Sequence, residues 1–175
     1  VIGSATAFEL AKRGYKTLNI DKLPASGYGS TSNSCAIVRA HYSTWDGVAM
    51  AYEGFFYWDD WNKYLEVEDE RGMAKYMKTG SIMFMLKGAD HSKKSLNLFK
   101  EIGVEHEIWD LETLKKKMPI YSHDSYNGTS RPDEDDSFFD KSGDQIEGAI
   151  WTPGSGYVSD PQLATHNLQV ATEAK

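Results

Sequence analysis

The first stretch of the chain changes from a helical to an extended hydrophobic pattern. Residues 4–13 are rich in helix formers, and their apolar members can share one buried face: Ala5, Phe8, Leu10 and Ala11. Gly14 follows at the position where helices commonly end. Residues 16–20 then predict a short strand that ends at Asp21. The predicted order is helix, tight turn, strand and acid.

A polar segment and an aromatic segment follow. Residues 23–36 are rich in glycine and serine, and they are too long and too polar for a simple turn, so we expect a functional loop. Residues 46–66 return to a helical pattern with an aromatic stripe, for which helix packing is a better explanation than a substrate cage. Its members are Tyr52, Phe55, Phe56, Trp58, Trp61 and Leu65.

The second half of the chain predicts further strands and helices. Strands are expected over residues 80–86 and 148–152, and short helices over residues 90–103 and 110–117. A final helix is expected to open at Asp160, because aspartate followed by proline favours a helix N-terminus.

Acidic residues crowd the stretch 121–147. The regular ligand spacing and the central glycine of a calcium loop are absent from it. We therefore interpret this stretch as a solvated insertion, and no metal site is expected.

Composition restricts the class of ligand. The 175-residue chain has a formal net charge of −7, which argues against nucleic acid, because phosphate binding depends on clustered lysine and arginine. A small molecule fits better. No run of about 18 apolar residues predicts a membrane span. The single Cys35 favours a reducing compartment, and a cytoplasmic location is expected.

Gly3 and Asp21 have the spacing of a dinucleotide-binding unit. Such a unit places a glycine-rich turn before its first helix and a carboxylate at the tip of its second strand, where the carboxylate accepts hydrogen bonds from a ribose. Gly3 matches the third glycine, and Asp21 has the position of the acid. A carboxylate there disfavours the 2′-phosphate of NADP.

The stretch VIGSATAFELAKRGYKTLNIDKLPASGYGSTSNSCAIVRAHYS resembles the N-terminal segment of the D-amino-acid oxidase superfamily, and within it the sarcosine oxidase and dimethylglycine dehydrogenase branch. The segments KTGSIMF at 78–84 and GSGYVSDP at 154–161 keep the order of later landmarks of that family. The resemblance implies an α/β fold, with a Rossmann-like FAD-binding domain and part of an α+β substrate-binding domain, incomplete at both ends.

The resemblance also implies a domain plan. Residues 1–45 would be the FAD-binding segment and residues 46–80 its helical continuation. Residues 81–150 would belong to the substrate-binding domain and carry the acidic insertion, and residues 151–175 would return toward the FAD domain. The residues implied to bind FAD are Val1, Ile2, Gly3, Asp21, Lys22, Gly29, Ser30, Thr31, Ser32, Asn33 and Ser34.

Arg39 matches an arginine that binds the substrate carboxylate in sarcosine oxidases. A structural ion pair is the alternative role for Arg39. Ser32 and Ala36 stand where those oxidases carry basic residues near the flavin, so the choice between oxidase and dehydrogenase stays open. His41 is interpreted as structural. Cys35 is expected to be a small buried thiol rather than a covalent flavin anchor.

The implied activity is FAD-dependent oxidation of a C–N bond in an amino acid, with hydride transfer to flavin N5. A secondary or tertiary N-methylated amine such as sarcosine or dimethylglycine is the first expectation, with a small amino-acid or amine substrate and the remaining part of the same polypeptide as partners. A primary amino acid or hydroxy acid is the alternative substrate. A non-catalytic FAD-binding electron-relay subunit is the alternative from another class.

Overall fold

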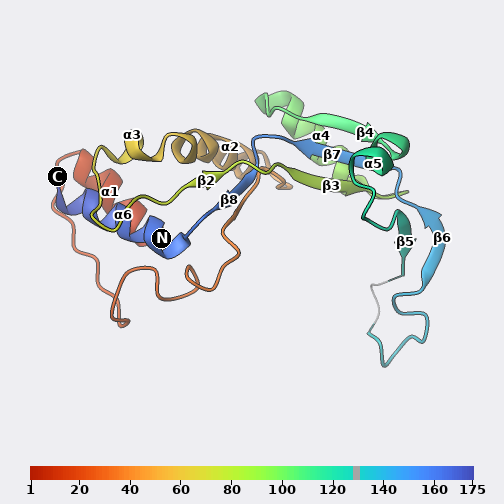
Figure 1. Cartoon of the computed structure of the whole chain (residues 1–175), viewed down its shortest axis with the longest axis horizontal. Helices are drawn as coiled ribbons and strands as arrows, with labels where there is room; N and C mark the ends of the chain where they lie inside the picture. The colour runs from red at the N-terminus through yellow and green to blue at the C-terminus, as the bar shows by residue number, and fades with distance from the viewer. Residues whose placement is uncertain (128–130) are drawn as a thin grey trace. The chain divides into compact units, whose positions relative to one another are not determined.

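The computed structural model describes residues 1–127 and 131–175, which fall into two compact units (Figure 1). The first unit consists of Val1–Arg39, Met50–Thr79 and Gly154–Lys175, and the second of Ala40–Ala49 and Gly80–Pro153. Helices and strands together give a mixed α/β structure, as predicted. The FAD-binding and substrate-binding roles assigned to parts of the chain stay predictions.

The first unit combines helices with a small antiparallel sheet. The sheet has the strand order β1-β8-β2, with Ile37 opposite Tyr157 and Tyr76 opposite Val158. Helix α2 begins in the second unit and ends in the first. The elements are α1 (Ile2–Lys12), β1 (Ile37–Val38), α2 (Trp45–Asp59), α3 (Trp61–Leu65), β2 (Tyr76–Met77), β8 (Gly156–Val158) and α6 (Pro161–Glu173).

Helix α1 ends at Lys12, and Gly14 forms the turn that stops it, as the sequence predicts. The glycine has a φ of 82°, in the left-handed region that residues with a Cβ rarely adopt. Its N–H donates to the Ala11 carbonyl at 2.8 Å, and the Tyr15 N–H donates to the Leu10 carbonyl at 3.1 Å. These two bonds satisfy carbonyls that the last turn of a helix leaves open.

The predicted strand over residues 16–20 is wrong. These residues have no regular secondary structure and join no sheet. A strand exists only through ladder bonds to a neighbour, and no described segment lies alongside to supply them. Leu18 and Ile20 are accordingly 82% and 86% exposed.

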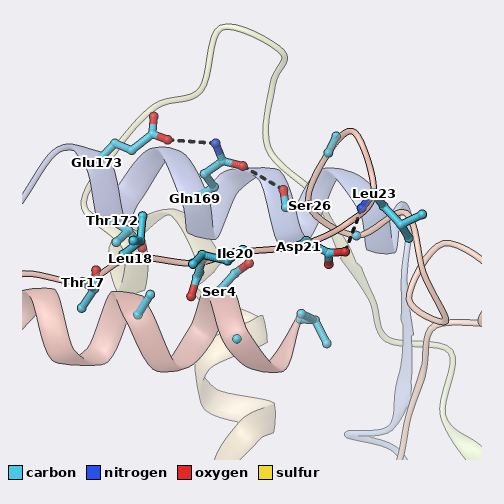
Figure 2. Close-up of a pocket in the computed structure, with 16 residues that line it drawn as sticks. Ser4, Thr17, Leu18, Ile20, Asp21, Leu23, Ser26, Gln169, Thr172 and Glu173 are labelled. Carbon is cyan, nitrogen blue, oxygen red and sulfur yellow. Dashed lines mark hydrogen bonds between the residues drawn. The ribbon is translucent and has the colours of Figure 1, made fainter.

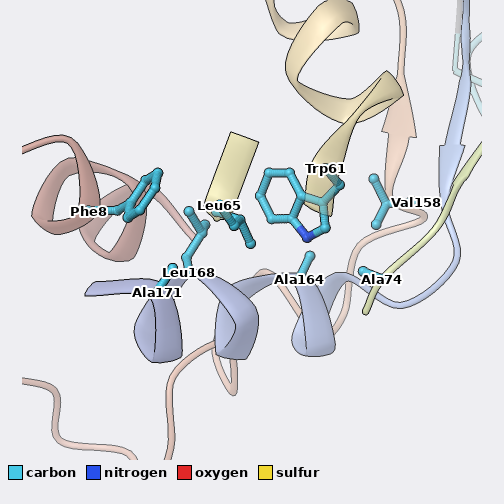
Figure 3. Close-up of a cluster of buried hydrophobic side chains, with 8 residues drawn as sticks. All are labelled: Phe8, Trp61, Leu65, Ala74, Val158, Ala164, Leu168 and Ala171. Atoms are coloured by element: carbon cyan, nitrogen blue, oxygen red, sulfur yellow. The ribbon is translucent and has the colours of Figure 1, made fainter. Parts of the chain in front are cut away.

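The core of the first unit forms where α1 and α3 meet α6. Phe8 and Leu168 are almost completely buried in it, and the Trp61 ring lies over α6 (Figure 3). Trp61 also stacks on Trp58 with 4.3 Å between ring centroids, so the aromatic stripe packs in large part as predicted. The buried members are Phe8, Trp61, Leu65, Ala74, Val158, Ala164, Leu168 and Ala171.

The second unit is built on an antiparallel sheet with the strand order β3-β7-β4. Ile150 of the central strand β7 lies opposite Met83 of β3 on one side and Ile108 of β4 on the other. The predicted strands and both predicted short helices are confirmed, and no bound differs from the predicted one by more than one residue. The elements are β3 (Ser81–Met85), α4 (Asp90–Ile102), β4 (Glu107–Asp110), α5 (Leu111–Lys117), β5 (Asp124–Tyr126), β6 (Lys141–Gln145) and β7 (Gly148–Thr152).

The acidic stretch 121–147 includes residues 128–130, which lie outside the described residues. Its described side chains are mostly exposed, as expected for a solvated insertion, but the stretch also contains the antiparallel pair β5 and β6. Asp124 pairs with Lys141 at 2.6 Å, and Asp144 pairs with Lys87 at 3.0 Å. Ion pairs and ladder bonds therefore organise a segment that its charge alone predicted to be loosely packed.

His41 is buried in the second unit, in agreement with a structural role. Its Nε2 lies 2.9 Å from Ser81 Oγ and 3.0 Å from Thr152 Oγ1, and the two hydroxyls are 2.8 Å apart. The ring also packs on Phe99. Among the described helices, none has the length and apolar character needed to cross a membrane.

Candidate functional site

A pocket of about 540 Å³ lies in the first unit beside the first turn of α1 (Figure 2). Its walls come from α1, the extended residues 17–21, the loop 23–27 and the last turns of α6. Asp21 and Ser26 lie toward one end of the pocket, and Thr17 and Glu173 lie toward the other. Two of the lining residues, Asp21 and Glu173, are acidic, and no lysine, arginine or histidine among the described residues lines the pocket.

Asp21 is held by its own loop. One carboxylate oxygen, Oδ1, accepts a hydrogen bond from the Leu23 N–H at 3.0 Å, which forms a local turn. Asp21 is exposed and lines the pocket together with Val1, the N-cap of α1, and Gly3 of its first turn. The backbone N–H groups and the positive dipole end of an 11-residue helix therefore share a pocket with a carboxylate.

A second pocket of about 410 Å³ in the first unit has mostly apolar walls. Ile37, Val38 and Trp58 form part of these walls. The hydroxyl-bearing lining residues are Ser30, Thr31 and Ser34. Val1 lines both pockets, so the two are neighbours at the start of α1.

The loop that carries these hydroxyls is folded onto itself. Ser32 Oγ and Asn33 Nδ2 both donate to the Gly29 carbonyl, at 3.1 and 3.0 Å. The Ser32 N–H donates to the Gly27 carbonyl at 2.9 Å, and the Ser34 N–H to the Thr31 carbonyl at 3.2 Å. Several polar groups of the loop are thus used in holding its turns.

The pockets bring together about half of the residues that the sequence singled out. Val1, Gly3 and Asp21 line the first pocket, and Val1, Ser30, Thr31 and Ser34 line the second. The remaining ones line neither: Ile2, Lys22, Gly29, Ser32, Asn33 and Arg39.

Arg39 follows β1 directly and is exposed. Within residues 1–127 and 131–175, its guanidinium makes no hydrogen bond or ion pair. Side chains alternate along extended backbone, so Arg39 would share a face with Ile37, which lines the second pocket.

Two expectations about single residues need correction. Cys35 is exposed rather than buried, because it lies in the polar loop and not in an element with an apolar face. Gly3 lies inside α1, and a Cβ there would meet its nearest neighbour, Asn19 Oδ1, at an ordinary 3.9 Å. Close packing against the described residues therefore does not require glycine at position 3.

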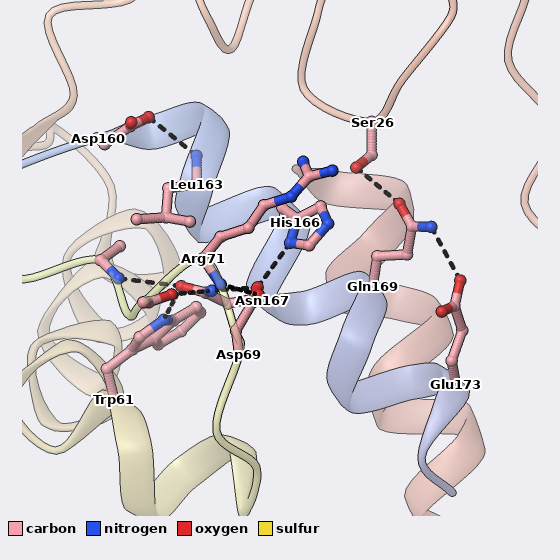
Figure 4. A network of polar contacts seen from close by, with 12 residues as sticks. Ser26, Trp61, Asp69, Arg71, Asp160, Leu163, His166, Asn167, Gln169 and Glu173 are labelled. Carbon is pink, nitrogen blue, oxygen red and sulfur yellow. Dashed lines mark hydrogen bonds and ion pairs between the residues drawn. The ribbon is translucent and has the colours of Figure 1, made fainter.

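Sequence reasoning missed the part of α6 that lines the first pocket. Ser26 Oγ donates to Gln169 Oε1 at 2.9 Å, and Gln169 Nε2 donates to Glu173 Oε1 at 2.8 Å (Figures 2 and 4). Ser26 and Gln169 are 143 positions apart, so no local pattern relates them. The sequence did predict the start of α6, because Asp160 caps it. It did not indicate which residues of α6 line the pocket.

A separate polar network joins α6 to the segment that follows α3 (Figure 4). The Asp69 carboxylate accepts from His166 Nδ1 at 2.6 Å, from Asn167 Nδ2 at 2.8 Å and from the Arg71 N–H at 2.9 Å. Asn167 Oδ1 accepts from the Ala74 N–H at 3.0 Å and from Trp61 Nε1 at 3.3 Å. Asn167 is completely buried, so this network belongs to the core rather than to a site.

Comparison with known proteins gives a consistent picture of the fold. The structure resembles L-proline dehydrogenase from P. horikoshii, at 20% identity and a TM-score of 0.71, over 99% of this chain and 39% of that one. It also resembles glycine oxidase from Geobacillus kaustophilus, at 20% identity and a TM-score of 0.66, over 98% of this chain and 41% of that one. A third similar structure is NikD, described as an unusual amino acid oxidase, at 16% identity and a TM-score of 0.53, over 99% of this chain and 38% of that one.

The chain spans about two fifths of the length of these structures. No curated protein matches it. The profile of one protein family, described as FAD dependent oxidoreductase and abbreviated DAO, matches residues 1–175. Because that match covers the whole chain, the protein belongs to the FAD-dependent oxidoreductase (DAO) family.

Proposed function

We propose that the protein containing this chain binds FAD across the two pockets of the first unit and oxidises the C–N bond of an amino acid. The favoured substrate is a secondary or tertiary N-methylated amino acid such as sarcosine or dimethylglycine. The observation that carries the substrate class is Arg39, an exposed guanidinium without a described partner that follows a strand lining the apolar pocket. Family membership supports the cofactor.

The first pocket fits the adenosine half of FAD. Its volume of about 540 Å³ lies within the ordinary range for small-molecule sites. A ribose offers hydroxyl donors, and Asp21 has a second oxygen, Oδ2, that accepts no hydrogen bond among the described residues. Two lining carboxylates would repel an additional phosphate, which favours an unphosphorylated ribose.

The start of α1 fits the pyrophosphate. Unpaired N–H groups and a positive dipole end are a recurrent anion site at helix N-termini. Val1 and Gly3 lie there, beside the first pocket, and Ser30, Thr31 and Ser34 bring hydroxyl donors to the second. The apolar walls of the second pocket, which include Trp58, suit a flat aromatic ring system. The residues present therefore fit FAD.

Arg39 is assigned to the substrate carboxylate. A guanidinium donates two parallel hydrogen bonds to a carboxylate and keeps its charge at all relevant pH values. Arg39 stays available for this role because no described acid neutralises it, which weakens the alternative of a structural ion pair. Holding the carboxylate would fix the orientation of the neighbouring C–N bond.

The proteins of similar structure support an amino acid as the substrate. L-proline and glycine, which appear in the names of two of them, both have a carboxylate one carbon away from the nitrogen, and proline is a secondary amine. Bound FAD would accept the hydride from the carbon next to nitrogen. The described residues of this chain would bind and orient, since Arg39 anchors one end of the substrate and the polar loop holds the cofactor.

Anaerobic reduction of the full-length flavoprotein tests the proposal. We expect N-methylated glycines to bleach the flavin absorption, and we expect the corresponding amides or esters, which have no carboxylate, to do so poorly. Arg39→Lys should raise KM because it loses the bidentate fork, and Arg39→Ala should cost about 2–4 kcal/mol in kcat/KM.

Other results would redirect the assignment. Bleaching by primary amino acids or hydroxy acids alone would keep the fold and change the substrate class. Bound flavin that no amine reduces would support the non-catalytic electron-relay subunit. Equal losses for acid and amide substrates in Arg39→Ala would show that Arg39 supports the fold or the flavin and does not bind the carboxylate.

A further inference from the structure

We propose that Gln169 is a positioning residue for the adenosine half of the cofactor: it docks the loop 23–27 onto α6 and thereby fixes Asp21. This inference rests on the proposed function, in which Asp21 receives the ribose. It concerns three polar side chains on one wall of the first pocket, which are Ser26, Gln169 and Glu173.

Gln169 has a defined amide orientation. Oε1 accepts from the Ser26 hydroxyl at 2.9 Å, and Nε2 donates to Glu173 Oε1 at 2.8 Å. A carboxylate can only accept, so rotating the amide by 180° would place two acceptor oxygens against each other. Glu173 therefore sets which atom of Gln169 faces the loop.

The loop backbone also touches the helix at the next residue, Gly27. It has a φ of 82°, and a Cβ built there would lie 3.2 Å from Thr165 Cβ and 3.3 Å from Gln162 Cα. The backbone conformation favours glycine here, and the close approach to α6 leaves little room for a side chain. The loop is thus docked at two consecutive residues, through the Ser26 side chain and the Gly27 backbone.

The docked end of the loop is connected to Asp21 over a short distance. Leu23 donates its N–H to Asp21 Oδ1 at 3.0 Å, and Pro24 has a restricted backbone between Leu23 and Ser26. A loop released from α6 would move the Leu23 N–H and let the carboxylate turn. Figure 2 shows Asp21 and Ser26 toward the same end of the pocket, with Gln169 next to Ser26 on α6.

Gln169 and Glu173 are exposed, so their bond is a minor contributor to folding. Because the bond lies on a wall of the first pocket, we infer that it acts on ligand binding rather than on folding. The role differs from that of Asp21, because Gln169 acts on the ligand through the loop. The prediction is a selective effect on a ligand that contains adenosine.

Comparing FAD with FMN tests whether the effect of Gln169 is selective for the adenosine half, because FMN has the same ring system without adenosine. In the full-length protein stripped of flavin, the dissociation constants of FAD and FMN are measured by fluorescence titration. We expect Gln169→Leu to weaken FAD about fivefold to tenfold, as for the loss of one hydrogen bond, and to leave FMN unchanged. Ser26→Ala tests the same contact from its other end.

Two further variants complete the design. The swapped pair Gln169→Glu with Glu173→Gln retains an acceptor for Ser26 and a donor for position 169, so it should restore FAD affinity. Glu53→Ala is the matched control, since it removes an exposed pair of the same i,i+4 spacing, Glu53 to Tyr57, on α2 of the same unit.

The outcomes are distinguishable. Wild-type protein that binds no FAD would overturn the proposed function. Wild-type protein that binds FAD, together with a Gln169→Leu variant whose FAD affinity matches the control, would overturn only the positioning role. An equal loss of FAD and FMN affinity would show a general structural defect and would also overturn it.

Discussion

Helix α6 has two polar sides that differ in burial. On one, Asn167 is completely buried and bonds to Asp69, Trp61 and backbone groups. On the other, Gln169 is exposed and bonds to Ser26 on a pocket wall (Figure 4). Buried polar groups are expensive to leave without partners, whereas exposed ones can exchange protein for water. One helix can therefore stabilise the fold through one side and support a ligand through the other.

The largest effect is expected at Asn167. Asn167→Ala leaves the Trp61 Nε1 and the Ala74 N–H without an acceptor and removes a donor from Asp69, so the free energy of unfolding should fall by about 3 kcal/mol. Urea denaturation measures it. Asn97→Ala, at an exposed position of α4, should change stability by less than about 0.5 kcal/mol. Similar losses in both variants would contradict the assignment of Asn167 to the core network.

The next largest effect on the free energy of unfolding is expected at Asp69, and it depends on pH. Burial raises the pKa of the Asp69 carboxyl, but three hydrogen bonds outweigh burial and hold this pKa below the ordinary value of 3.8. A lowered folded-state pKa contributes stability that is present above the unfolded value and is lost as pH falls through the folded one. The donors are the Arg71 N–H and the side chains of His166 and Asn167.

Asp69→Asn should therefore cost about 2 kcal/mol at neutral pH, because hydrogen bonds to a charged acceptor are lost. The difference between wild type and variant should begin to shrink below about pH 4, where the unfolded-state carboxylate binds a proton, and should shrink further as pH falls through the lower folded-state pKa of Asp69. Denaturation curves at several pH values check this. A difference that stays constant down to pH 2 would show that the charge of Asp69 does not matter.

A smaller effect is expected at the N-terminus of α6. Asp160 accepts hydrogen bonds from the N–H groups of Gln162 and Leu163, each at 2.9 Å. Asp160→Ala should cost about 1 kcal/mol, and Asp160→Asn should cost much less, because asparagine caps helices equally well. Thermal unfolding of the two variants gives the comparison. Equal destabilisation would assign the effect to charge rather than to capping.

The smallest effect on stability is expected for Gln169→Leu. Its exposed hydrogen bonds should contribute less than about 0.5 kcal/mol to folding. Urea denaturation of the flavin-free protein measures this value. A loss as large as that of Asn167→Ala would remove the contrast between the two sides of α6.

Local signals predicted those parts of the fold that depend on neighbours in sequence. Gly14 and Asp160 mark helix ends through their own backbone or side chain, and the structure confirms both. Asp21 was identified by its spacing from Gly3, and the two residues line the same pocket. The assignment of Asp21 to a ribose stays a prediction.

Contacts over long sequence separations could not be predicted in this way. Asn167 and Asp69 are 98 positions apart, and nothing in either segment indicates the other. The strand expected over residues 16–20 failed for the same reason, because extended sequence becomes a strand only beside a partner. Cys35 was wrongly expected to be buried, because the usual burial of cysteine is weaker evidence than the polarity of the loop around it.

The exposure of Cys35 has a practical consequence for labelling chemistry. It is the single thiol of the chain, and it lies in the polar loop directly after Ser34, which lines the second pocket. A maleimide dye attached there would report the environment of that loop without competing attachment sites in these 175 residues. A change in loop mobility on ligand binding could then be tested by dye anisotropy, independently of flavin absorption.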